Sequence, residues 1–150
     1  MRVILIALGL ALGAGGAAKP VAIKDVPPAV RRTIERERRG ATVQALSKER
    51  VRGHTRYALE TLIDGHGRNI VIDEYGRVIE VGEEMPVEEL PSAVRKRFES
   101  HGTITKAEQI TRGSERSYEA TLDRRGRKAH MAVDPGGRVL RVSRVKSRPS

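Results

Sequence analysis

A turn motif that decides the fold occurs twice in this chain, as IDEYGRV at Ile72–Val78 and as VDPGGRV at Val133–Val139. In both copies an Asp opens a D-x-x-G turn between β-branched residues, which is typical of a tight β-hairpin. Asp73 and Asp134 are expected to accept hydrogen bonds from the backbone of their own turns rather than to act as a pair of catalytic acids. The two copies are offset by 61 residues (134 against 73). A period near 60 residues predicts a duplicated α/β unit.

The residues around the motif repeat as well. VPPAV at Val26–Val30 returns as LPSAV at Leu90–Val94, at an offset of 64 residues (90 against 26). Proline is tolerated in the first turn of a helix, so both segments predict a helix start. Apolar residues then recur at i, i+4 and i+8 and give each helix one apolar stripe: Val26, Val30 and Ile34 in the first, Leu90, Val94 and Phe98 in the second. Tyr57 and Tyr118 repeat in mid-strand, where each ring is expected to fill the core.

The first residues have the pattern of an export signal. A short positive start, the apolar run Val3–Leu12 and small residues up to Ala18 predict a signal peptide over 1–18. Residues 19–25 are then an exposed lead-in. The chain has no Cys, so an exported protein of this sequence has no disulfides and depends on its core. We therefore expect a periplasmic or secreted bacterial protein.

The chain is strongly basic, with 29 Lys and Arg against 19 Asp and Glu and a net charge of +10. Such a field attracts polyanions such as lipopolysaccharide and acidic lipid. The basic residues are spread through the sequence and mixed with acids, which is typical of an ordinary solvated surface. With one Phe, three Tyr and no Trp, the chain has few aromatic rings for stacking on single-stranded nucleic acid, so nucleic acid is not an expected partner.

The patterns together predict an α+β protein of two tandem repeats, each one helix followed by a four-stranded antiparallel sheet. The first repeat spans 26–82, a linker 83–88 follows, the second repeat spans 89–144, and 145–150 form a basic tail. The expected strands are 42–47, 55–63, 69–73 and 77–81 in the first repeat, and 103–108, 117–122, 128–133 and 138–144 in the second.

The repeated motifs resemble the PepSY-like family, whose members are similar to β-lactamase-inhibitor proteins. The helix starts carry the (L/V)-P-x-x-V pattern, Tyr57 and Tyr118 lie in the central Y-x-(V/A) strand, and the two Asp–Gly turns give the (V/I)-D-x-x-G-x-(V/L/I) hairpin. The resemblance covers about Val26 to Val142. It implies an exported protein without enzymatic activity, with a binding or inhibitory role.

Residues that do not repeat, together with arginines near the C-terminus, are the best candidates for a partner-binding site. Tyr75 lies in a turn and has Gly136 as its counterpart, and exposed tyrosines are enriched at interaction hot spots. His66 lies between two turn glycines. Arg138, Arg141 and Arg144 alternate with apolar residues near the C-terminus, so several of them are expected to share one strand face and could hold phosphates.

No catalytic pattern is present. The four histidines lack metal-ligand spacing, no Ser lies in a nucleophile motif, and no cofactor-binding loop occurs, so we expect no enzyme activity, metal or cofactor. The leading interpretation is an exported binding module that inhibits a peptidase or recognises an envelope protein. The alternative is a basic binder of lipopolysaccharide or acidic lipid.

Overall fold

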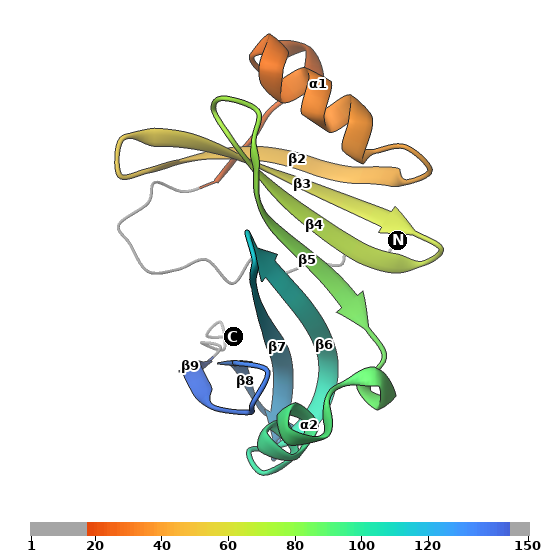
Figure 1. Ribbon diagram of the computed structural model, residues 1–150, viewed down its shortest axis with the longest axis vertical. Helices are drawn as coiled ribbons and strands as arrows, with labels where there is room; N and C mark the ends of the chain where they lie inside the picture. The colour runs from red at the N-terminus through yellow and green to blue at the C-terminus, as the bar shows by residue number, and fades with distance from the viewer. Residues whose placement is uncertain (1–17, 145–150) are drawn as a thin grey trace. The chain divides into compact units, whose positions relative to one another are not determined.

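The computed structural model describes residues 18–144, which fall into two compact units that divide between Gly82 and Glu83. Figure 1 shows the order of the elements. The first unit contains β1 (Lys19–Pro20), the short 3-10 helix η1 (Ile23–Asp25), α1 (Pro28–Glu37), β2 (Thr42–Val51), β3 (His54–Ile63), β4 (His66–Asp73) and the start of β5 (Val78–Met85). Residues 1–17 of the expected signal peptide and the basic tail 145–150 lie outside the described residues.

The second unit repeats this order. It contains the end of β5, the 3-10 helix η2 (Val87–Glu89), α2 (Ser92–Glu99), β6 (Thr103–Arg112), β7 (Glu115–Arg124), β8 (Arg127–Val133) and β9 (Val139–Arg144). Both units therefore place a helix before a run of antiparallel strands, and each strand pair for which a register is resolved is antiparallel.

The predicted fold class is wrong in its sheet arrangement. Two tandem repeats, each one helix followed by a four-stranded antiparallel sheet, were expected, but the strands form one nine-stranded sheet in the order β1 to β9. The physical reason lies in β5, which continues past Gly82 through Glu83–Met85 and so includes residues expected to form a linker. A strand that ends a sheet leaves a row of backbone groups unpaired. In this sheet β5 has a neighbour on both sides.

The lead-in is also more structured than its sequence indicates. Lys19 and Pro20 pair with Lys48 and Ser47 as the edge strand β1, a position where proline is tolerated. Val21 and Ile23 then pack against the core of the first unit. The segment 19–25 thus covers one margin of the sheet.

The core of each unit lies between its helix and one face of its strands (Figure 1). In the first unit the predicted stripe Val26, Val30 and Ile34 is buried. It packs with Leu46, Tyr57, Leu59, Ile70 and Ile72. In the second unit Leu90, Val94 and Phe98 pack with Ala107, Tyr118, Ala120, Leu122, Met131 and Val133. The predicted core roles of both tyrosines are confirmed.

The three-residue difference between the two halves lies at the end of the helix. Both first strands after the helix carry a β-bulge at the same place, between Val43 and Ala45 in β2 and between Ile104 and Lys106 in β6. From Thr42 and Thr103 onward the two halves therefore align at a constant offset of 61 residues. The extra residues belong to the longer helix α1 and the loop behind it. Neither helix of the described residues is long and apolar enough to cross a membrane.

Candidate functional site at the first Asp–Gly turn

The two D-x-x-G turns have the same hydrogen-bonded scaffold. In the first turn (73–77), Asp73 Oδ1 accepts hydrogen bonds from the backbone N–H groups of Tyr75 and Arg77, both at 2.9 Å. In the second turn (134–138), Asp134 Oδ1 accepts from Gly136 and Arg138 at 3.0 and 2.9 Å. The turn role predicted for both aspartates is confirmed.

An arginine side chain closes each turn from outside. Arg77 Nε donates to Asp73 Oδ2 at 2.7 Å, and Arg138 Nε donates to Asp134 Oδ2 at 3.1 Å. Burial by itself raises the pKa of Asp73, but hydrogen bonds from the backbone and guanidinium of Arg77 outweigh burial and hold the pKa below its usual value. The backbone N–H of Arg138 chiefly lowers the pKa of Asp134. Both carboxyl groups are therefore held as charged hydrogen-bond acceptors.

Each turn also rests directly on the first turn of its helix. Gly76 and Gly137 have φ values of +86° and +84°, and a Cβ at either position would lie 2.6 Å from the Ala29 carbonyl oxygen or 2.7 Å from that of Ala93. Only glycine combines this left-handed backbone with so close an approach. The turns are thereby fixed to the helices, which makes their tips rigid platforms.

The tips of the two turns differ. In the first turn Tyr75 is 66% exposed, and the guanidinium carbon of Arg77 lies 5.5 Å from the centroid of its ring. This distance is within the range of a cation–π contact. At the equivalent place the second turn has Gly136, which presents no side chain. The predicted candidate Tyr75 is thus an exposed aromatic side chain on a rigid support.

A second contact secures the first tip to the neighbouring hairpin. His54, the first residue of β3, has its Nδ1 2.9 Å from Glu74 Oε1, and the Thr55 backbone N–H lies 3.5 Å from Glu74 Oε2. The hydrogen bond with His54 is the main reason why the pKa of Glu74 is lowered, and the Tyr75 hydroxyl adds a smaller contribution. His54, Glu74, Tyr75 and Arg77 together form one polar and aromatic surface, which we call the first-turn cluster.

Two members of the first-turn cluster, His54 and Glu74, were not predicted as site residues. At an offset of 61 residues their counterparts are Glu115 and Pro135, so neither side chain recurs in the second half. The absence of both side chains from the second half could have marked them as candidate site residues. It was missed because His54 and Glu74 are 20 residues apart, and only the strand pairing brings them together.

His66, the histidine that the sequence predicted as a site residue, is remote from this cluster. His66 begins β4 and pairs with Ile63, whereas the first turn follows the other end of β4 at Asp73. A strand of this length separates its two ends by about 25 Å. His66 is exposed, but it does not join Tyr75 in one site.

The three predicted arginines lie in or next to β9 and do not form a single stripe. Arg141 pairs with Ala132 and Arg144 with Ala129, so these two side chains point to opposite faces, because successive residues of a strand alternate. Arg138 is held by Asp134, and Arg141 Nη2 lies 2.9 Å from Glu119 Oε1. The expectation of a shared arginine face does not hold for Arg141 and Arg144.

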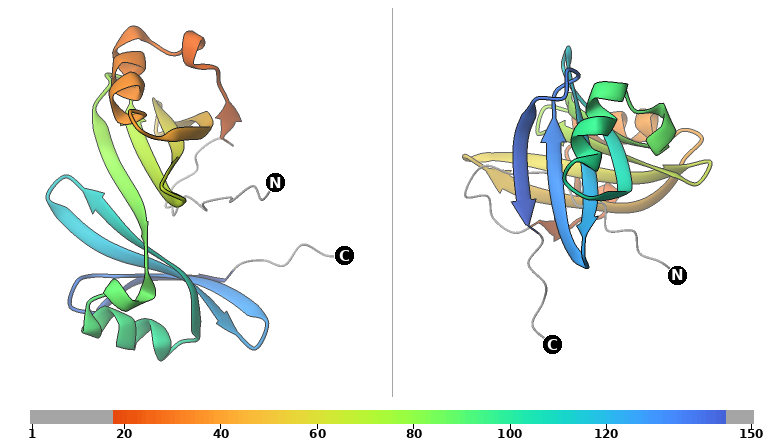
Figure 2. Two further views of the ribbon diagram at one scale, coloured as in Figure 1. Left: turned by 90° about the vertical axis from the view of Figure 1, so that its right-hand side faces the viewer. Right: turned by 90° about the horizontal axis from the view of Figure 1, so that it is seen from below.

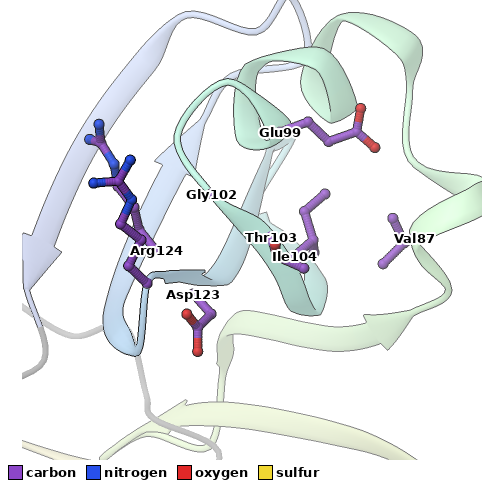
Figure 3. Close-up of a pocket in the computed structure, with 8 residues that line it drawn as sticks. Val87, Glu99, Gly102, Thr103, Ile104, Asp123 and Arg124 are labelled. Carbon is purple, nitrogen blue, oxygen red and sulfur yellow. The ribbon is translucent and has the colours of Figure 1, made fainter.

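A shallow pocket of about 590 Å³ lies in the second unit, at the end of α2 (Figure 3). Its apolar side chains are Val87 and Ile104, and charged side chains surround them. Glu99 already pairs with Arg95 at 2.8 Å, and Asp123 accepts the Gly126 N–H at 2.8 Å. The acids around this pocket are therefore engaged by the protein itself. Within residues 18–144 no group of three or more His, Cys, Asp or Glu side chains is placed to hold a metal ion.

Comparison with known proteins places the fold but not the family. No protein-family model and no curated protein matches the chain. Among solved structures, a candidate periplasmic protein from Bacteroides eggerthii matches with a TM-score of 0.64 and 14% identity, over 79% of this chain and 88% of the other. A DUF2874 family protein from Bacteroides uniformis matches with a TM-score of 0.62 and 14% identity, over 79% and 89%.

A BLIP-like protein from Bacteroides fragilis matches with a TM-score of 0.59 and 18% identity, over 83% of this chain and 89% of the other. At these identities the likeness concerns the fold alone. It is consistent with a BLIP-like or PepSY-like fold. The chain is thus similar in fold to the BLIP-like and DUF2874 proteins over most of its length.

Proposed function

We propose that this chain is an exported binding module of the PepSY-like type, without enzymatic activity, that recognises another protein of the cell envelope through the first-turn cluster. The inhibition of a peptidase is one form that this recognition could take. The observation that carries the proposal is Tyr75, which is 66% exposed and lies on a turn that packs against α1 through Gly76. Rigid aromatic anchors of this kind dominate the energetics of protein interfaces.

The similar structures support a periplasmic location and a binding role. One is a candidate periplasmic protein and another is a BLIP-like protein, which agrees with export to the periplasm and with a binding or inhibitor-like role. The first-turn cluster also lacks the arrangement of nucleophile, base and oriented acid that catalysis requires. The exposed aromatic and charged side chains of the first-turn cluster suit a binding role.

The alternative, a binder of lipopolysaccharide or acidic lipid, has weaker support. Several arginines that could hold phosphates are already engaged by acids of the same chain. Examples are Arg38 with Glu35 at 3.0 Å and Arg141 with Glu119 at 2.9 Å. A phosphate would have to compete with each of these carboxylates.

The test is capture from periplasmic extract with the wild-type chain and with Tyr75→Ala. Protein recognition predicts that a captured protein persists at moderate salt and is lost with Tyr75→Ala. The matched control is Gly136→Ala, at the equivalent place of the second turn, where a Cβ would meet only Asp134 Oδ1 at 3.4 Å. If only anionic lipid is recovered, with binding that falls steeply with salt and with Arg→Gln changes, the proposal is wrong.

A further inference from the structure

Three of the four large apolar side chains exposed in the described residues lie in one strand, β9. Val139, Leu140 and Val142 are 38%, 51% and 53% exposed. β9 comes last in the sheet order, and its only neighbour there is β8 (Figures 1 and 2). The backbone on its other side therefore presents N–H and C=O groups that no described strand pairs with. An edge strand of this kind is a template for another extended chain.

The counterpart of β9 in the first half of the chain offers a comparison for this edge. β5 is the counterpart of β9, with Val78, Ile79 and Val81 at the places of the three exposed residues. In the sheet order β5 is followed by β6, whereas no described strand follows β9. The same backbone pattern thus occurs once with a following strand and once without.

The charges on β9 define the chemistry of the missing neighbour. Where β5 carries Glu80 and Glu83, β9 carries Arg141 and Arg144, so the fold itself does not require arginine there. Arg144 is exposed and has no ion pair with any residue of the described part of the chain. A second copy of β9 would bring further arginines into the same short ladder, which disfavours self-pairing. An acidic side chain beside Arg144 would complement its charge, whereas Arg141 is already paired with Glu119.

The pairing of β9 with β8 shows which side chains a partner strand would need at each position. β9 pairs with β8 without interruption from Arg141 to Arg144, after a bulge opposite Ala132 and Val133. Val142 and Arg144 lie on one sheet face, and Arg141 and Ser143 lie on the other. A strand added beside this stretch would place an apolar side chain next to Val142 and an acid two residues away, next to Arg144.

We propose that the outer edge of β9 is a binding site for an extended polypeptide segment with acidic side chains, which joins the sheet as a further strand. This surface is separate from the first-turn cluster and does not depend on the function proposed for it. The main-chain hydrogen bonds provide the affinity, and Val142 and Arg144 select the side chains.

The experiment uses the full chain and a capped peptide of repeated sequence Glu-Thr-Val-Glu. Binding is followed by backbone NMR and amide hydrogen exchange. We expect saturable binding, with shift changes and new exchange protection concentrated in β9. The same peptide with an N-methyl group on every residue has no backbone N–H to donate at either edge, so it cannot form the ladder and should not bind. A Lys-Thr-Val-Lys peptide should bind about fivefold more weakly, the size of one exposed charge contact.

Arg144→Glu should reverse the preference between the two peptides, whereas Arg39→Glu, which makes the same change of net charge at an exposed position of the first unit, should not. No binding at millimolar peptide, unchanged binding of the N-methylated peptide, or shift changes away from β9 would each overturn the proposal. A concentration-dependent dimer with protected β9 amides would show that the occupant is a second copy and would overturn it equally.

Discussion

The two Asp–Gly turns share a scaffold and differ at their tips. Each has an Asp that accepts two backbone N–H groups, an Arg that closes the turn and a Gly packed on the helix. Only the first presents an exposed Tyr and a His–Glu contact beside it. The shared part is explained by folding alone, because each unit needs its hairpin fixed to its helix. The difference therefore marks the part of the molecule that is free to serve recognition.

The largest effect is expected from adding a methyl group where the turns meet the helices. Gly76→Ala and Gly137→Ala each place a Cβ within 2.7 Å of a carbonyl oxygen at a positive φ, so each should cost about 3 kcal/mol of unfolding free energy. Urea denaturation measures this. Gly65→Ala and Gly126→Ala are matched controls, with φ of +78° and +79° and open space around the Cβ, and should cost about 1 kcal/mol. Equal losses at all four sites would refute the close contact.

A smaller effect is expected from removing the charge of the turn aspartate. Asp73→Asn weakens the bond with Arg77 and should cost about 1.5 kcal/mol at neutral pH. The folded-state pKa of Asp73 lies below its unfolded value, so its contribution is present above the unfolded pKa and is lost as pH falls through the folded pKa. The stability gap between wild type and variant should therefore close in acid. A gap that stays constant down to low pH would contradict this assignment.

The sequence predicted both helix starts, the apolar stripes, the two tyrosines of the core and both Asp–Gly turns. Each of these depends on local chemistry, such as Pro27 before a helix or Gly76 after an Asp. It did not predict that β5 continues beyond Gly82, because Glu83, Glu84 and a nearby proline also fit a linker. Sheet pairing depends on backbone groups that are the same in every residue, and for this reason the single sheet left no mark on the residue pattern.

The candidate site was predicted only in part, for the same reason. Tyr75 was found because a turn aromatic stands out without any partner. His54 and Glu74 were missed because their meeting depends on which strand ends lie together. The arginines of β9 were predicted to share a face, but the pairing of Arg144 with Ala129 places it opposite to Arg141.

The halves also differ in how the helix holds the turn, and this difference predicts unequal losses. Thr33, 3% exposed, donates its hydroxyl to the Gly76 carbonyl at 2.5 Å, whereas the exposed Arg97 donates Nε to the Gly137 carbonyl at 2.9 Å. Thr33→Val leaves a part-buried carbonyl without this donor and should cost about 1 kcal/mol, while Arg97→Gln should cost about half as much because water can replace the guanidinium. Thermal unfolding of both variants measures which one loses more stability. A larger loss for Arg97→Gln would contradict this prediction.

The smallest effect concerns the contact beside Tyr75. His54→Ala removes the main cause of the lowered pKa of Glu74, so the Glu74 carboxyl should titrate at a higher pH in the variant. An NMR pH titration of the side-chain carboxyl resolves the change. Glu115→Ala, at the equivalent place in β7, is the control. If the titration of Glu74 is unchanged in His54→Ala, His54 does not contact Glu74 and is not part of the first-turn cluster.

The most direct test of the central claim is site-specific photo-crosslinking at the two tips. A benzoylphenylalanine replaces Tyr75 in one chain and Gly136 in another, and both are exposed to the same envelope proteins. Our account predicts a discrete crosslinked protein from position 75, competed away by unlabelled wild-type chain, and none from position 136. Equal crosslinking from both tips, or none from position 75 while position 136 reacts, would contradict it.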